Sequence, residues 1–398
     1  MNKVNIVSFI VINIFVVFNC QAELSVCELQ NIEIPNSVAA AQVTEYNAKL
    51  DSECKLSTKY KQVRTKLQEF DGVVLTDINL YQAMRFVQRS WYDTSKAAQI
   101  PIQKTYQVKK EDYLKPISER STVIWDNWEI GIKQLEPLVL AKATGAEFTF
   151  EELRNVHRGF FTLSDEQGDF AHRPDPGLVK APNENDNPWW DFKSVEEAEQ
   201  AQIVVNELNE DYKAMGLVAN FEGGVLAKNP TINFPLQIKK TNDIYSIYSG
   251  DSRANPILIK NLFKFINVMM TAARQKTHMI WNGRLMTPFE VAAFAQQFYV
   301  AIHPFSEGNG RTSRFIQEFI LSSFDLPHGS SGDLMDYDVL TNHQKYYTLA
   351  FARTYEQLFR LENCVDAYKD LPKKERNRLK SADLSQLNYD CQLIKNQQ

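Results

Sequence analysis

The sequence predicts a mainly α-helical protein that contains one small β-hairpin and starts with a helical region of its own. Most of the chain repeats apolar residues at three- and four-residue spacing, which is the period of an amphipathic helix. One segment, FPLQIKKTNDIYSIYSG (234–250), alternates on either side of a Thr-Asn-Asp turn, which predicts a hairpin. Gly, Pro, Asp and Asn gather between the helical segments, where they mark loops.

Residues 1–22 are typical of a secretory signal peptide. Lys3 precedes an apolar run from Val4 to Phe18, and we expect cleavage after Ala22. A membrane anchor is the alternative, but as a helix this run spans only ~22 Å of a ~30 Å hydrocarbon core. Lipid attachment at Cys20 is a second alternative. The leader predicts an exported protein, secreted or periplasmic, with delivery to a host as one option, and no membrane span is expected in the mature chain.

The cysteines agree with export. Cleavage would remove Cys20 and leave an even number near the two ends of the mature chain: Cys27, Cys54, Cys364 and Cys391. No pair has the close spacing of a zinc site, so disulfides are expected. Of the three possible pairings, the local one is favoured, Cys27–Cys54 with Cys364–Cys391, and four buried free thiols are the alternative.

Length and charge limit the function classes. The 398 residues are enough for two or three domains of ~100–200 residues each. A net charge of −5 gives no electrostatic case for binding nucleic acid. Residues 23–147 are expected to form a helical N-terminal region without a catalytic motif, and residues 366–398 a C-terminal tail. The oligomeric state is not predicted.

The central part of the chain begins with a helix in TFEELRNVHRGFFTL, which Thr149 is expected to cap. His157 on this helix is expected to be structural. An insertion around 164–230 follows; it opens with a loop rich in Pro, Gly, Asp and Asn and returns to helix over 192–215. After the hairpin, helices are expected over 256–275, 287–302, 314–324 and 342–365.

The helix over 287–302 has complete start signals. Thr287 is expected as its cap, Pro288 fits the first helical position, and Glu290 would complete a capping box. Its apolar residues form one stripe that should face the core: Val291, Phe294, Ala295, Phe298, Ala301 and Ile302.

The loop after this helix, HPFSEGNGRTSR (303–314), combines groups that bind an anion. Backbone N–H groups around Gly308, Asn309 and Gly310 can wrap oxygen atoms, at the positive end of the next helix. Arg311 and Arg314 add positive charge to this already positive helix end. Such an arrangement is best explained by the binding of a phosphate group there.

Glu307 would repel such a phosphate unless a cation lies between them. Mg²⁺ commonly binds through one or two carboxylates together with substrate phosphates, so the loop predicts a metal-bridged di- or triphosphate. His303, at the end of the preceding helix, can take a proton from an attacking hydroxyl. The spacing is not that of a P-loop.

The same twelve residues resemble the signature of the Fic family, His-Pro-Phe-x-Asp/Glu-Gly-Asn-Gly-Arg-x-x-Arg, at every defined position. The resemblance implies a Fic-type helical core over 148–365, with the hairpin as a flap that aligns a target protein. It implies transfer of AMP from ATP to a Ser, Thr or Tyr hydroxyl of that target.

By the same resemblance, His303 would be the general base and Glu307 would bind Mg²⁺. Asn309 with the neighbouring backbone would hold the α-phosphate, while Arg311 and Arg314 would hold the β- and γ-phosphates. Removal of AMP, transfer of another phosphate-linked group, or an idle protein-binding module are the alternatives.

Many Fic proteins carry an inhibitory helix, Ser/Thr-x-x-x-Glu-Gly/Asn. The nearest segment here, LFRLEN, places Leu358 where Ser or Thr belongs. Glu362 in this segment is therefore expected to be an ordinary helix residue.

Overall fold

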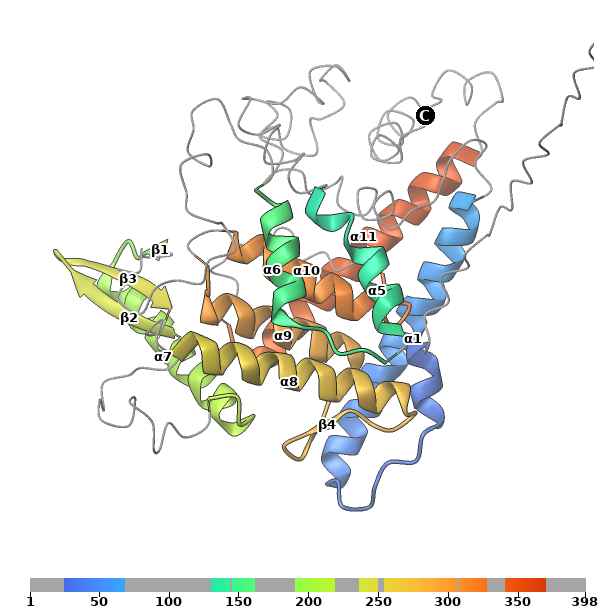
Figure 1. Ribbon diagram of the computed structural model, residues 1–398, viewed down its shortest axis with the longest axis horizontal. Coiled ribbons are helices and arrows are strands. Elements are labelled where there is room, and N and C mark those ends of the chain that lie inside the picture. The colour runs from blue at the N-terminus through green and yellow to red at the C-terminus, as the bar shows by residue number, and fades with distance from the viewer. Residues whose placement is uncertain are drawn as a thin grey trace, which may run out of the picture.

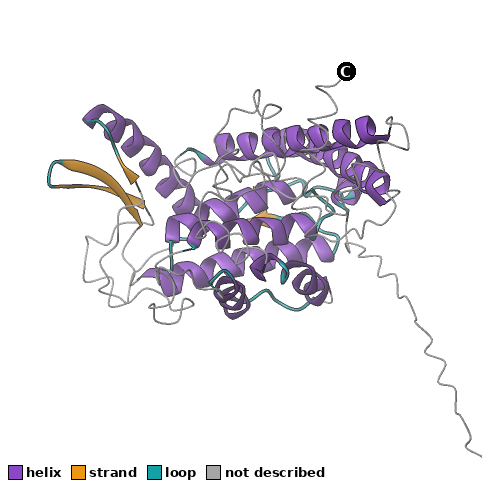
Figure 2. Cartoon of the chain, turned by 90° about the horizontal axis from the view of Figure 1, so that it is seen from above, coloured by secondary structure: helices purple, strands orange, loops and turns teal. Residues whose placement is uncertain are grey.

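A computed structural model of the chain describes residues 25–68, 130–143, 145–161, 190–218, 236–249, 254–305, 308–327 and 341–369. The predicted signal peptide, the loop predicted to open the insertion, Glu307, Cys391 and most of the predicted C-terminal tail lie outside these ranges. Within them, the prediction of a mainly helical fold with a small sheet is confirmed (Figure 1, Figure 2). None of the described helices is both long and apolar enough to cross a membrane.

The helical elements are η1 (Val26–Asn31), α1 (Ala40–Gln68), α5 (Leu135–Ala143), α6 (Phe150–Gly159), α7 (Val195–Ala214), α8 (Asn255–Arg274), α9 (Pro288–Ile302), α10 (Asn309–Ser322) and α11 (His343–Lys369). The strands are β1 (Trp190–Asp191), β2 (Leu236–Thr241), β3 (Ile244–Ser249), β4 (Ile280–Trp281) and β5 (Arg284–Leu285).

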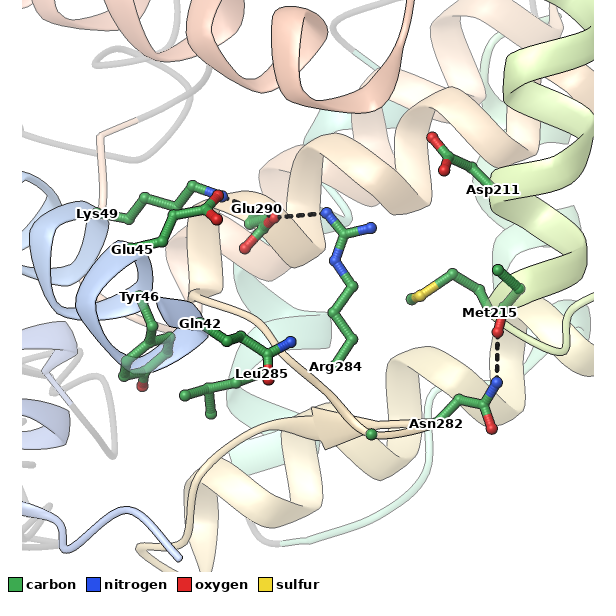
Figure 3. Close-up of a pocket in the computed structure, with 12 residues that line it drawn as sticks. Gln42, Glu45, Tyr46, Lys49, Asp211, Met215, Asn282, Arg284, Leu285 and Glu290 are labelled. Carbon is green, nitrogen blue, oxygen red and sulfur yellow. Dashed lines mark hydrogen bonds and ion pairs between the residues drawn. The ribbon is translucent and has the colours of Figure 1, made fainter. Parts of the chain in front are cut away.

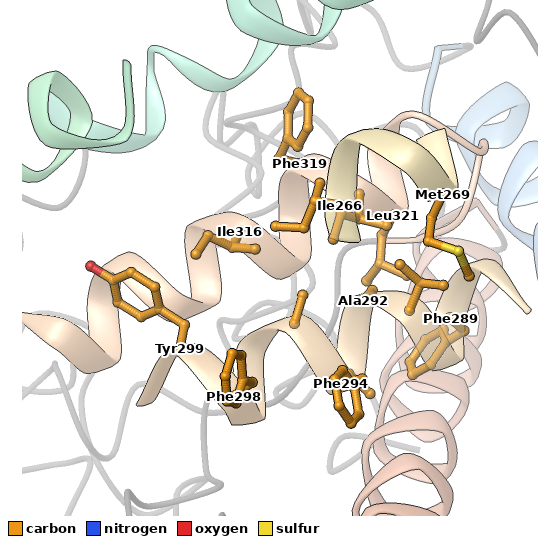
Figure 4. Packing of buried hydrophobic residues seen from close by; sticks show 14 of the residues in the cluster. Ile266, Met269, Phe289, Ala292, Phe294, Phe298, Tyr299, Ile316, Phe319 and Leu321 are labelled. Carbon is orange, nitrogen blue, oxygen red and sulfur yellow. The ribbon is translucent and has the colours of Figure 1, made fainter. Parts of the chain in front are cut away.

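Helix α9 is the centre of the core. It contacts α8, α10 and α11, and Figure 4 shows its aromatic side chains among apolar residues of α8 and α10. Every residue from Pro288 to Ile302 is buried, so the expectation of a single buried stripe was too narrow. Polar side chains on its other face are buried too and need partners; Gln297 Nε2 donates to the Thr341 carbonyl at 2.8 Å.

The hairpin prediction is confirmed by β2 and β3, which pair in antiparallel register from Leu236↔Ser249 to Thr241↔Ile244. Asn242 and Asp243 both have positive φ, 49° and 64°, as a two-residue turn of this kind requires. Strand β1 adds to the far side of β3, which sequence reasoning did not foresee.

A second hairpin, β4–β5, was also missed. Its turn is Asn282-Gly283, with φ of 49° and 78°, and an Asn-Gly pair between apolar residues is a strong hairpin signal that could have located it.

The N-terminal helix α1 packs on the core rather than forming a separate unit. A disulfide joins Cys27 in η1 to Cys54 in α1, which confirms the first predicted pair. Lys59 and Lys66 of α1 bind Glu362 of α11 at 2.5 and 3.3 Å, and the two helices lie side by side in Figure 1. Glu362 is thus an interhelical ion-pair residue, as expected of an ordinary helix position.

Helix α1 also caps α9. The Thr149 and Thr287 caps are confirmed, each accepting from a backbone N–H three residues on. The capping box predicted for Glu290 was wrong, because its carboxylate instead binds Lys49 at 3.0 Å and Arg284 at 3.1 Å. Glu53 takes its place from α1: it accepts from the Thr287 hydroxyl and from the Phe289 N–H at 3.1 Å.

Burial, with Glu290 nearby, raises the pKa of Glu53 to about 8. In the unfolded chain this carboxyl ionises near its ordinary value, so between about pH 4.5 and 8 the folded protein holds one more proton than the unfolded chain. Stability contributed by this group is therefore present at acid pH and lost as pH rises to 8, by on the order of a few kcal/mol. Glu53→Gln should flatten this part of the curve of unfolding free energy against pH, measured by denaturant titration from pH 5 to 8.

Asp51→Asn is the matched control, because Asp51 is an exposed residue of α1 whose carboxylate contacts Lys55 at the surface. It should leave the pH dependence as in the unmodified protein. Parallel curves for the Glu53→Gln variant and the unmodified protein would show that Glu53 does not take up the proton.

Candidate active site

The predicted motif lies at the junction of α9 and α10. Helix α9 ends at Ile302, and the residue that follows, His303, has a left-handed backbone with φ 50° and ψ 56°. Helix α10 begins at Asn309 after Gly308, which is also left-handed, with φ 73°. A left-handed residue other than glycine costs roughly 1–2 kcal/mol, and such strain gathers at functional sites. His303 is thus turned out of α9 at the mouth of the loop.

The half-buried His303 ring lies with Nδ1 3.3 Å from the Val300 carbonyl oxygen. A carbonyl can only accept, so in the neutral ring Nδ1 carries the hydrogen and Nε2 carries the lone pair. This contact favours the tautomer in which Nε2 can accept a proton.

Asn309 closes the loop on itself. Its Nδ2 donates to the Phe305 carbonyl at 2.7 Å, and its Oδ1 accepts from the Phe305 N–H at 3.0 Å. The side chain is buried, so its described contacts hold the loop in shape. Its predicted contact with an α-phosphate stays a prediction, and the loop-closing role is one that sequence reasoning missed.

Helix α6 packs against the loop. The His157 ring stacks on Phe305 with centroids 3.8 Å apart, and its Nδ1 lies 2.8 Å from the Thr312 hydroxyl. That hydroxyl donates to the Gly308 carbonyl at 2.9 Å. His157 has a structural role, as expected, and its contacts with Phe305 and Thr312 hold the motif loop in place. The sequence offers no local signal for this, because the partners are 155 positions apart.

The two motif arginines stand in the first turns of α10, where no acidic residue lies. Arg311 donates from Nη1 to the Phe160 carbonyl at 3.1 Å, and its guanidinium lies 4.5 Å from the centre of the Phe161 ring. Arg314 is buried. The helix terminus, its N–H groups around Gly310 and the two guanidiniums together favour an anion.

Residues 237–321 match the Fic/DOC family. The match runs from β2 through α10, and so takes in the hairpin, α9 and the whole motif. A solved structure of a Fic domain containing signaling protein from Bacteroides thetaiotaomicron is similar to this chain at 12% identity and a TM-score of 0.41, over 77% of this chain and 98% of that one. No curated protein matches the chain.

The residues predicted for the site lie close together along the chain, as far as they are described. His303, Gly308, Asn309, Gly310, Arg311 and Arg314 all lie in or beside one loop. Glu307 lies outside the described residues, so its metal-binding role is untested. Elsewhere among the described residues, no group of three His, Cys, Asp or Glu side chains could hold a metal ion.

Proposed function

We propose that this protein transfers AMP from ATP to a Ser, Thr or Tyr hydroxyl of a target protein and releases pyrophosphate. The observation that carries the proposal is the α9–α10 junction of the Fic/DOC domain. There, one short loop joins a histidine, whose Nδ1 contacts the end of α9, to a helix terminus that carries two arginines.

In the proposed reaction, the target hydroxyl oxygen attacks the α-phosphorus of ATP while Nε2 of His303 takes the hydroxyl proton. The bond between the α-phosphorus and the bridging oxygen breaks, and that oxygen leaves with pyrophosphate. The backbone N–H groups at the start of α10, with Arg311 and Arg314, would hold the phosphate oxygens and stabilise charge that develops on them.

The donor set suits a nucleotide phosphate chain, since the described groups at the start of α10 are N–H donors and guanidiniums. A carboxylate such as Glu307 is the ligand type that Mg²⁺ takes beside phosphate. Bound there, Mg²⁺ would neutralise phosphate charge and reconcile Glu307 with the anion.

The β2–β3 hairpin is proposed to align the target. Because β3 is the middle strand of the sheet β1-β3-β2, β2 is an edge strand among the described residues. An edge strand offers backbone N–H and C=O groups that can pair with an extended segment of another protein.

We also propose that the target is met outside the envelope of the producing cell. The Cys27–Cys54 disulfide supports an oxidising route, which agrees with the predicted leader. ATP is then needed at the destination, such as a host cytosol or an endoplasmic reticulum lumen. A mature protein confined to a nucleotide-poor periplasm, beside a modified resident target, would contradict this proposal.

The function is tested by incubating the mature protein with a lysate, Mg²⁺ and ATP, then searching the lysate proteins by mass spectrometry. AMP should appear on hydroxyl side chains, and other nucleoside triphosphates run in parallel establish the preference. Omission of Mg²⁺ by chelation should remove the product. Absence of any nucleotide adduct on protein, with a folded enzyme, would exclude the proposed transfer.

A further inference from the structure

A polar cavity of about 330 Å³ lies at the end of α9 opposite the motif (Figure 3). Its walls come from α1, the C-terminal end of α7, the β4–β5 turn and the first turn of α9. The 15 residues of α9 place this cavity ~20 Å from the loop that follows His303. It is therefore not a part of the proposed active site, and two of its walls, α1 and α7, lie outside the Fic/DOC match.

Most charged groups in the wall satisfy one another. Buried Glu290 lies between Lys49 Nζ at 3.0 Å and Arg284 Nη2 at 3.1 Å, and Lys49 also binds Glu45 at 2.6 Å. Behind them, burial and the cations Arg284 and Lys49 hold the pKa of His343 well below its usual range, so this ring is neutral. Two carboxylates thus balance two cations without any ligand.

Asp211, on α7, is the one carboxylate of the described wall that does not take part in these ion pairs. In the part of the chain that the structure describes, its carboxylate makes no hydrogen bond or ion pair; the charges that act on it are Arg284, which attracts it, and Glu207, which repels it. Burial raises its pKa, which is the response of a carboxylate that lacks a close cation. The neighbouring Arg284 guanidinium opposes that rise, yet the two side chains form no ion pair. Asp211 therefore offers a free acceptor to the cavity.

Arg284 supplies the matching donors. One guanidinium nitrogen binds Glu290, and a guanidinium carries five N–H groups. The side chain is partly exposed and extends from β5 between Glu290 and Asp211, as Figure 3 shows. The cavity thus presents an acceptor and donors toward one small space. Asn282 holds the β4–β5 turn against α7, because its side-chain amide donates to the Ala214 carbonyl at the end of α7.

We propose that this cavity binds a small zwitterion of the amino-acid class, with its ammonium group on Asp211 and its carboxylate on Arg284. An anion alone would meet three carboxylates against two cations in the wall. A cation alone would pair with Asp211 and leave the spare N–H groups of the partly exposed Arg284 to water, and an apolar ligand would pair with neither group. The volume lies at the low end of the ~300–1,000 Å³ range of ligand pockets, which suits one amino acid or a dipeptide.

The test is calorimetric titration of the full mature protein with each of the common amino acids. Methylammonium chloride and sodium acetate, at the same ionic strength, serve as probes that carry one charge each. At least one amino acid should bind, and the single-charge probes should bind about tenfold more weakly or not at all. The bound amino acid should also raise the unfolding temperature, since it binds the folded chain alone.

Asp211→Asn should weaken binding of that amino acid about tenfold and leave folding intact, because no described side chain depends on this carboxylate. Glu210→Gln is the matched control: Glu210 is the adjacent residue on α7, exposed, and 3.6 Å from Lys213. This control should bind like the unmodified protein.

Three results would overturn the proposal. The first is that no amino acid binds, and the second is that both variants lose affinity equally. The third is that acetate binds the unmodified protein as tightly as the amino acid does, which would make this an anion site on Arg284. None of these outcomes bears on AMP transfer, so the two proposals fail separately.

Discussion

Replacing His303 by alanine should lower the rate of AMP transfer by about 10²–10⁴-fold, because a positioned general base contributes an effect of that size. The nucleotide should still bind, since the phosphate-binding groups at the start of α10 are untouched. The measurement is incorporation of labelled AMP into a target protein under saturating ATP and Mg²⁺.

His303→Asn is the companion variant, because asparagine tolerates the left-handed backbone that α9 adopts here. This variant lacks the base but keeps the backbone conformation, so it distinguishes the loss of the base from a change in the structure of the helix end. Both variants should unfold at a denaturant concentration close to that of the unmodified protein. Transfer by either variant within tenfold of the unmodified rate would remove His303 from the role of base.

Replacing Gly308 by alanine should destabilise the protein by about 2–5 kcal/mol. A left-handed backbone costs a residue with a side chain roughly 1–2 kcal/mol, and overpacking adds about 1–3 kcal/mol. The new Cβ would lie 2.7 Å from Cε2 of Phe161 and 2.9 Å from Cε1 of His157. Both rings are rigid, and His157 is held by its stack on Phe305, so the loop itself must move. The free energy of unfolding from denaturant titration gives the loss of stability.

Gly283→Ala provides the control for the backbone contribution alone. Gly283 has a φ of 78°, close to the 73° of Gly308, but a Cβ there would meet no atom within 4 Å. Its variant should lose only the roughly 1–2 kcal/mol of backbone strain. The additional loss at Gly308, with a loss of AMP transfer that Gly283→Ala does not share, measures the contact with His157 of α6 and with Phe161 just after it. Equal losses at the two sites would mean that these two rings do not constrain the motif.

The His303 and Gly308 variants test two different features of the motif. His303 leaves the helical path at the end of α9 because its own backbone is left-handed. The loop that follows is held by hydrogen bonds of Asn309 and by the stack of His157 on Phe305. Reaction geometry must be kept within fractions of an ångström, and a displacement of about 1 Å can cost ~10²-fold in rate. The support from α6 is therefore as important to the proposed transfer as the motif itself.

The sequence determined the features that depend on neighbours along the chain. The Thr149 and Thr287 caps bind N–H groups three residues away, and the Asn242-Asp243 turn depends on its own backbone. The order of groups from His303 to Arg314 is also local, so a base beside a phosphate-binding loop could be predicted before the fold was known, whereas the choice of AMP came from the resemblance to the Fic family.

Only the tertiary structure decided which distant groups complete these features. Glu53 caps α9 from 234 positions away, and Glu290 leaves its own helix end to bind Lys49 on α1 and Arg284 on β5. His157 lies under the motif, and Asp211 faces Arg284 across a cavity. A buried polar group must find a partner wherever the packed chain supplies one, and sequence spacing does not record which segment that is.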